Sequence, residues 1–199
     1  KEEDVFYAYG ISADLISDCS SAGLIRVAGL KDIEKLDYAN LKYEELSEKL
    51  LVRYIAQGTL WKMGEMFQLS VELYDTKDKK VVWSDRWQEK WDNLPTIKGS
   101  LSNGLLKALD TNYNLEKRLN NTNIEAYEYY LKAKYKINNR ENIEDKQIAK
   151  GLLQKAVELD ENLIQARNLL GWIYFGLDDN SEKAIEHFKY ALSKAEELD

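Results

Sequence analysis

A spacing of small and large apolar residues recurs 35 residues apart in the C-terminal half of the chain. The two occurrences are Ala149-x3-Leu153-x2-Ala156 and Ala184-x3-Phe188-x2-Ala191. Small residues at helical spacing let two helices approach closely, and the large residue between them fills the remaining space. A period of this length is typical of helical hairpins that stack as a repeat array, and such arrays usually present a binding surface.

The second occurrence follows Leu170-Gly171-x2-Tyr174, and residues 123–197 resemble tetratricopeptide repeats. The resemblance implies two helical hairpins, 123–138 with 144–159 and 162–177 with 181–197. The first helix matches less well, since it lacks the Leu-Gly pair and carries instead Ala126, Tyr127, Tyr130, Leu131 and Ala133. The alternative is an ordinary packing of four helices with a coincidental period.

The repeat family binds peptides in a concave groove lined by the first helix of each hairpin. Six residues are candidates for that groove by this resemblance: Tyr127, Tyr130, Lys134, Arg167, Asn168 and Tyr174. The charged side chains among them would read an acidic or carboxylate-bearing segment. Packing of Tyr127 and Tyr130 against the preceding domain is an equal alternative.

Residues 1–110 show a different pattern. Helical segments are expected at 11–22, 43–51 and 94 to about 109, with a short strand at 24–28. Three longer strands are expected at 53–63, 66–76 and 81–91, joined by short polar turns. In the middle strand, Phe67 to Leu73 alternate between apolar and polar, which predicts one buried and one exposed face. The predicted fold class is therefore α+β, a small mixed or antiparallel sheet with covering helices. An all-α repeat array follows after residues 111–122, which are expected to be a linker or an extension of the third helix.

The first 110 residues also resemble the amino-terminal domain of TolB-like proteins. The resemblance rests on Phe6-x3-Gly10-Ile11, Val52-Arg53-Tyr54-Ile55-x2-Gly58-Thr59-Leu60, Val71-Glu72-Leu73-Tyr74-Asp75 and Val82-Trp83-Ser84-Asp85-Arg86-Trp87. A TolB-like domain followed by tetratricopeptide repeats is similar to regulatory tails behind bacterial class III adenylate or guanylate cyclase domains, or behind winged-helix domains. That family opens with an apolar strand that Lys1 to Tyr9 do not supply, so we expect the chain to be a fragment.

Tryptophans and carboxylates in residues 1–110 allow two interpretations each. Trp83, Trp87 and Trp91 share one face of a continuous strand, and Trp61 on a neighbouring strand could join them. Core packing is favoured over a stacking platform for sugars or bases, with Trp91 the most peripheral. The i, i+4 carboxylates of Asp14 and Asp18 are expected to be solvated rather than to form an acid/base pair.

Composition excludes several classes of function. Residues 1–110 hold 15 basic and 19 acidic side chains and residues 111–199 hold 13 and 16, so neither half has the basic surplus that nucleic-acid binding requires. No apolar run is long enough to span a membrane. One cysteine and one histidine, Cys19 and His187, supply neither an internal disulfide nor a zinc site, and no cofactor motif is present.

The sequence therefore predicts a non-catalytic protein-interaction and regulatory module. The partner is a protein or peptide segment, and self-association is expected through an apolar stripe on the last helix, Ile185, Leu192 and Ala195. The alternative is a sensor that binds a small ligand at the TolB-like domain, with the repeats as a scaffold. A cytoplasmic location is favoured, and an extracytoplasmic one stays open.

Overall fold

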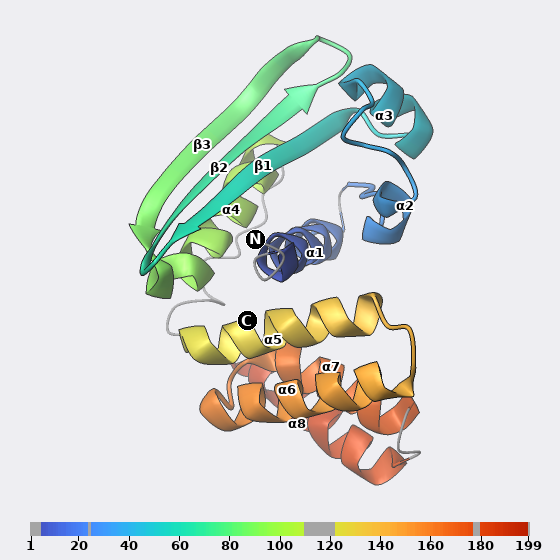
Figure 1. The fold of residues 1–199 in the computed structure, drawn as a ribbon, viewed down its shortest axis with the longest axis vertical. Coiled ribbons are helices and arrows are strands. Elements are labelled where there is room, and N and C mark those ends of the chain that lie inside the picture. The colour runs from blue at the N-terminus through green and yellow to red at the C-terminus, as the bar shows by residue number, and fades with distance from the viewer. Residues whose placement is uncertain (1–4, 24, 110–121, 177–179, 199) are drawn as a thin grey trace. The chain divides into compact units, whose positions relative to one another are not determined.

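The computed structural model describes residues 5–23, 25–109, 122–176 and 180–198 (Figure 1). The chain forms two compact units, one of residues 11–116 and one of residues 1–10 together with 117–199. We call them the sheet unit and the helical unit. Their boundary falls inside helix α1 (Val5–Ser21), so the first residues group with the C-terminal helices. All of the expected linker except Thr122 lies outside the described residues.

The sheet unit contains an antiparallel three-stranded meander. Strands β1 (Tyr54–Met63), β2 (Met66–Asp75) and β3 (Lys80–Lys90) follow one another in space as in sequence. Gly64 and Lys79 have φ values of 63° and 51°, in the left-handed region that tight hairpin turns use. The prediction of a contiguous meander from residue 53 to residue 91 is confirmed.

One face of the sheet is covered by helix α4 (Leu94–Ala108), as Figure 1 shows. On β2 the predicted alternation is confirmed, with Phe67, Leu69, Val71 and Leu73 all buried. On α4, Leu101 and Leu105 are buried as well. The helix approaches the sheet closely at Gly104, where a Cβ atom would lie 2.5 Å from the Trp83 ring.

The segment between α1 and β1 differs from the sequence expectation. Residues 25–28 pair with no strand, so the predicted strand at 24–28 is wrong for the residues described there. Ile25 and Val27 pack against buried Cys19, and the Arg26 guanidinium donates to the carbonyl oxygens of Leu50 and Leu51, at 2.8 and 2.7 Å. The side chain of Arg26 thus provides hydrogen bonds to the free carbonyl groups at the C-terminal end of helix α3 (Tyr43–Leu50). A short helix, α2 (Leu30–Glu34), lies between α1 and α3 in the sequence and was not expected.

The helical unit contains two hairpins close to the predicted ranges. Their helices are α5 (Ile124–Asn138), α6 (Ile143–Leu159), α7 (Ile164–Gly176) and α8 (Ser181–Leu198). Asparagine side chains cap three of them, because Asn123, Asn142 and Asn180 each accept a hydrogen bond from the backbone N–H three residues later. Helix α5 packs on α6, α6 on α7, and α7 on α8.

Close helix contacts depend on two glycines. A Cβ atom on Gly171 of α7 would lie 2.7 Å from the Phe188 ring of α8, so the repeated small-large spacing does bring these two residues together. A Cβ atom on Gly10 of α1 would lie 2.6 Å from Leu131 of α5. The first part of α1 therefore covers α5 within the helical unit, and the edge-to-face contact of Tyr9 with Tyr135, 5.3 Å between centroids, belongs to the same packing.

Candidate functional site

Three of the six candidate groove residues are buried. Tyr127, Tyr130 and Tyr174 expose only 2%, 4% and 7% of their surface. The rings of Tyr127 and Tyr130 lie 5.9 Å apart on successive turns of α5. These tyrosines contribute packing in the unit, and the open surface is formed by other side chains.

The remaining three candidates are more accessible. The Nζ atom of Lys134 donates to the hydroxyl of Tyr130 at 3.2 Å. Arg167 donates from Nε to the carbonyl oxygen of Glu161 at 2.8 Å, and its guanidinium lies 3.7 Å from the ring centroid of Tyr190 on α8. Asn168 is exposed. No contact within the described residues joins Lys134 to Arg167, so the structure does not gather the six candidates into one cluster.

A stacked pair links α7 to α8 beside Arg167. The rings of Tyr174 and His187 are nearly parallel, with centroids 5.4 Å apart, and Gln154 of α6 donates to the Tyr174 hydroxyl at 3.1 Å. Burial, followed by the charge of Arg167, lowers the pKa of His187. The imidazole is therefore neutral at neutral pH.

Five apolar residues of α7 and α8 form a group that we call the end face. Trp172 and Phe175 expose 63% and 54% of their surface, and Ile185 and Leu192 expose 50% and 61%. Phe188 lies between them, half-buried, with its ring centroid 5.5 Å from that of Trp172. The rings of Trp172 and Phe175 meet edge to face at 6.3 Å. These contacts join the three aromatic rings, and Ile185 and Leu192 lie three residues before and four residues after Phe188 on the same face of α8.

Helical geometry explains why this surface is left open. Helix α7 buries Ala166, Leu170 and Ile173 on one side, and Trp172 and Phe175 project from the other side. Each preceding helix of the unit has a packed neighbour on both sides, whereas no described residue covers the end face.

The expected stripe on the last helix is only part of that face. Ile185 and Leu192 are exposed as predicted, while the side chain of Ala195 lies outside the described residues. Sequence reasoning missed the contribution of Trp172 and Phe175, which share a helix face with the candidate Asn168 at i, i+4 and i+7. That spacing was the available signal.

The tryptophans of the sheet do not form one stacking platform. Trp83 and Trp87 share the face covered by α4, with ring centroids 6.4 Å apart. Trp61 pairs in register with Gln68 on the opposite face and is 65% exposed, so it does not join them. Trp91 was expected to be peripheral, but it is 6% exposed, because the chain turns into a 3-10 helix, η2 (Trp91–Asn93), that places its ring edge to face on Phe67.

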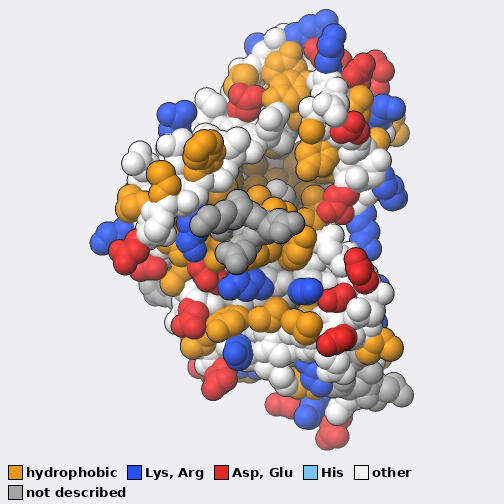
Figure 2. Space-filling model, in the orientation of Figure 1, with side chains coloured by type: hydrophobic (Ala, Val, Ile, Leu, Met, Phe, Trp, Pro, Cys, Tyr) orange, Lys and Arg blue, Asp and Glu red, His pale blue; other side chains and the backbone are white. Residues whose placement is uncertain are grey.

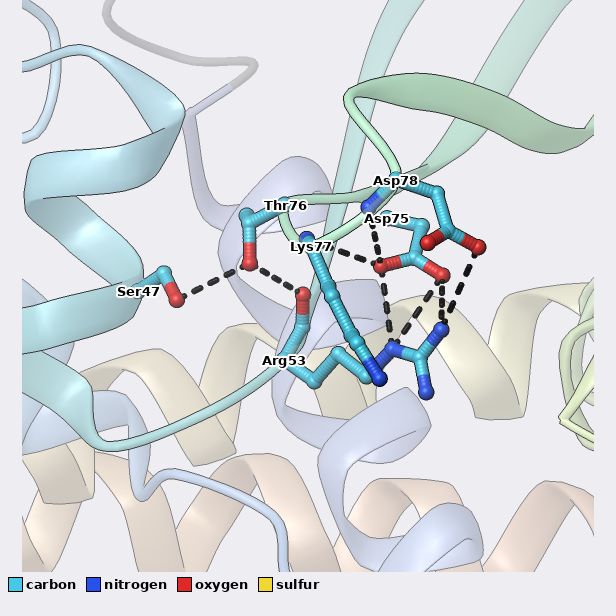
Figure 3. Close-up of polar contacts among 6 residues, drawn as sticks. All are labelled: Ser47, Arg53, Asp75, Thr76, Lys77 and Asp78. Atoms are coloured by element: carbon cyan, nitrogen blue, oxygen red, sulfur yellow. Dashed lines mark hydrogen bonds and ion pairs between the residues drawn. The ribbon is translucent and has the colours of Figure 1, made fainter.

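An ion pair fixes the end of the β-hairpin (Figure 3). The guanidinium of Arg53 donates to both carboxylate oxygens of buried Asp75, at 3.0 and 2.6 Å. The same carboxylate accepts the backbone N–H groups of Lys77 and Asp78 in the turn. These hydrogen bonds, chiefly those from Arg53, lower the pKa of Asp75 to about 2. Every acceptor position is engaged locally, which indicates a structural role.

Asp14 of α1 is buried and Asp18 is partly buried, so the expectation of a solvated pair is wrong. Asp14 exposes 4% of its surface, and Asp18 forms an ion pair with Lys98 of α4, which exposes 3%. Ser102 of α4 donates to the same carboxylate at 2.7 Å. Burial and the charge of Asp18 raise the pKa of neighbouring Cys19 to about 11, so this thiol stays protonated, as a core residue should. The cluster ties α1 to α4.

Surface charge agrees with the composition. Figure 2 shows Lys and Arg side chains interspersed with Asp and Glu over the face it draws. Within the described ranges, no three His, Cys, Asp or Glu side chains gather into a metal-binding group. The helices that the structure describes include none with the length and apolar composition needed to cross a lipid bilayer.

Comparison with known proteins adds no relative. Neither models of protein families nor curated protein sequences match this chain.

Proposed function

We propose that this chain is a non-catalytic protein-interaction module and that its end face, together with the accessible side chains beside it, binds a protein partner. Asn168 continues the face along α7, and Arg167 and Lys134 supply positive charge elsewhere on the helical unit. The resemblance to TolB-like and tetratricopeptide-repeat proteins supports a regulatory role within a bacterial signalling protein such as an adenylate or guanylate cyclase.

The exposure of Trp172 and Phe175 carries the proposal. Large aromatic side chains dominate the energetics of protein interfaces, because they bury much area while losing little conformational entropy. On a monomeric surface, a continuous group of such side chains marks an interaction site. These two side chains are more than half exposed and lie next to each other on α7.

The polar clusters of the sheet unit support a scaffolding role. Asp75 and Asp18 are engaged by Arg53 and Lys98 respectively, and neither pair faces a group that it could activate. Turnover of nucleotides or other substrates is therefore not expected of these residues. An assay of the purified chain for nucleotide hydrolysis or cyclisation tests this part, and any turnover that persists through purification overturns it.

The binding role is tested by comparing partner capture between variants in a lysate of the native source. Trp172→Ala/Phe175→Ala should lose the specific partners, while Ile143→Ala, which truncates an equally exposed apolar residue on α6, should keep them. Arg167→Glu/Asn168→Ala tests the flanking polar contacts in the same experiment. Retention of all partners by the double aromatic variant would reject the end face as the binding site.

A further inference from the structure

We propose that the partner bound by the end face is a second copy of this chain, with the two α8 helices packed antiparallel about a two-fold axis. This inference rests on the proposed function, since it uses the same surface. It adds the identity of the occupant and the pairing of individual residues across the contact.

The amount of apolar surface fits a contact between copies. The four most exposed side chains of the end face present roughly 450 Å² in all, at about 200 Å² for a large apolar side chain. A stable interface buries about 800 Å² on each partner, of which somewhat more than half is apolar. The end face with its polar rim therefore matches one half of a dimer interface.

The charges beside the apolar stripe are self-complementary. Glu182 and Lys189 are both exposed and lie seven residues apart on α8, the same separation as Ile185 and Leu192. The charged pair and the apolar pair therefore form two parallel rows along α8. The charged row lies beside the apolar row, on the side that points away from α7. Neither Glu182 nor Lys189 forms an ion pair within the part of the chain that the structure describes.

A two-fold axis beside Ile185 brings the charged rows of the two copies into opposition. In an antiparallel arrangement about that axis, Glu182 of each copy lies opposite Lys189 of the other, and the two Ile185 side chains meet at the centre. The contact is isologous, so each favourable pair occurs twice. A parallel two-fold arrangement would instead leave the charged rows of the two copies on opposite flanks of the contact, so neither pair could form.

Sedimentation equilibrium of the intact chain between roughly 1 and 300 μM measures the association. We expect a reversible dimer. Ile185→Glu should weaken dimerisation at least a hundredfold, because it places two negative charges against each other at the centre of the contact. Ile143→Glu adds the same charge to an exposed apolar position of α6 and should leave the dimer unchanged.

A charge exchange tests the pairing itself. Glu182→Lys or Lys189→Glu alone sets like charges opposite each other at two symmetric places, and each should raise the dissociation constant roughly tenfold at low salt. The combined variant Glu182→Lys/Lys189→Glu restores opposite charges and should dimerise as the unmodified chain does. Circular dichroism of each variant checks that the helices are retained.

Either of two results overturns the inference: a monomer at all concentrations, or single charge variants whose weakening the combined variant does not reverse. The proposed function fails separately, since it requires that Trp172→Ala/Phe175→Ala lose captured partners. A monomeric chain that still captures another protein through those aromatics would reject the second copy and retain the binding role.

Discussion

Replacing Asp18 by Asn should destabilise the sheet unit strongly, although the two side chains have the same shape. The substitution removes the charge that balances Lys98, an ammonium group with 3% of its side chain exposed. Ser102 retains a second acceptor, the carbonyl oxygen of Lys98 at 3.1 Å, so the hydroxyl is not left without a partner. The effect therefore isolates the buried charge.

The expected magnitude follows from the burial of the pair. Removing one partner of a buried ion pair typically costs about 3–5 kcal/mol. The Asp18 side chain is 18% exposed, which lets some water reach the pair, and we therefore take about 3 kcal/mol. For a unit of this size, that loss lowers the melting temperature by roughly 10–20 °C.

Tryptophan fluorescence during thermal and urea unfolding measures the change. In a Trp172→Phe background all remaining tryptophans belong to the sheet unit, so the signal reports that unit. Asp32→Asn is the matched control, because Asp32 forms an ion pair with Lys35 in which both side chains are more than half exposed, and it should cost less than about 0.5 kcal/mol. Asp18→Leu/Lys98→Met should recover most of the stability. Equal effects of Asp18→Asn and Asp32→Asn would refute the reasoning.

Three further predictions concern packing and pH. Gly171→Ala should lower the free energy of unfolding of the helical unit by about 1–2 kcal/mol in urea, because the new methyl group meets the Phe188 ring. Adding Phe188→Leu should relieve this clash and recover stability. An unchanged stability of Gly171→Ala would mean that the ring moves aside freely. Because the pKa of Asp75 is depressed to about 2, its stabilisation is present above the ordinary carboxyl pKa and is lost as the pH falls from about 4 toward 2, and Asp75→Asn should flatten stability measured across that window. The pKa of His187 is lowered as well, so the stability of the helical unit should decrease as the pH falls below about 6.5. His187→Gln should remove that decrease. The same dependence of stability on pH in His187→Gln and in the unmodified chain would contradict burial of the neutral ring.

Periodicity predicted the regular elements well because burial enforces it. The alternation on β2 and the spacing Ala149, Leu153, Ala156 each require one buried face, and the structure buries all of these side chains. Residues 24–28 show the limit of that signal. A mostly apolar pentapeptide is equally suited to a strand and to an irregular segment packed on a core, and only the tertiary partners of Ile25 and Val27 decide between them.

Side-chain environments were harder to predict than elements. A carboxylate on a helix usually faces water, so the burial of Asp18 depends on Lys98, which is 80 residues away and unrelated by any local pattern. Tyrosines suited to a groove are equally suited to an interior, and Tyr127 is buried because α5 is packed on more than one side. The end face was predicted only on α8, since α7 alone does not reveal which of its faces is covered.

Photo-cross-linking from the end face tests the central claim most directly. A benzophenone amino acid in place of Trp172 should form protein adducts at low concentration of the chain, and excess unlabelled chain should compete with them, because this side chain sits in the binding surface. The same amino acid in place of Gln147, an exposed residue of α6, should not. Identical adducts from both positions, or none from position 172, would contradict the assignment of the end face as a protein-binding surface.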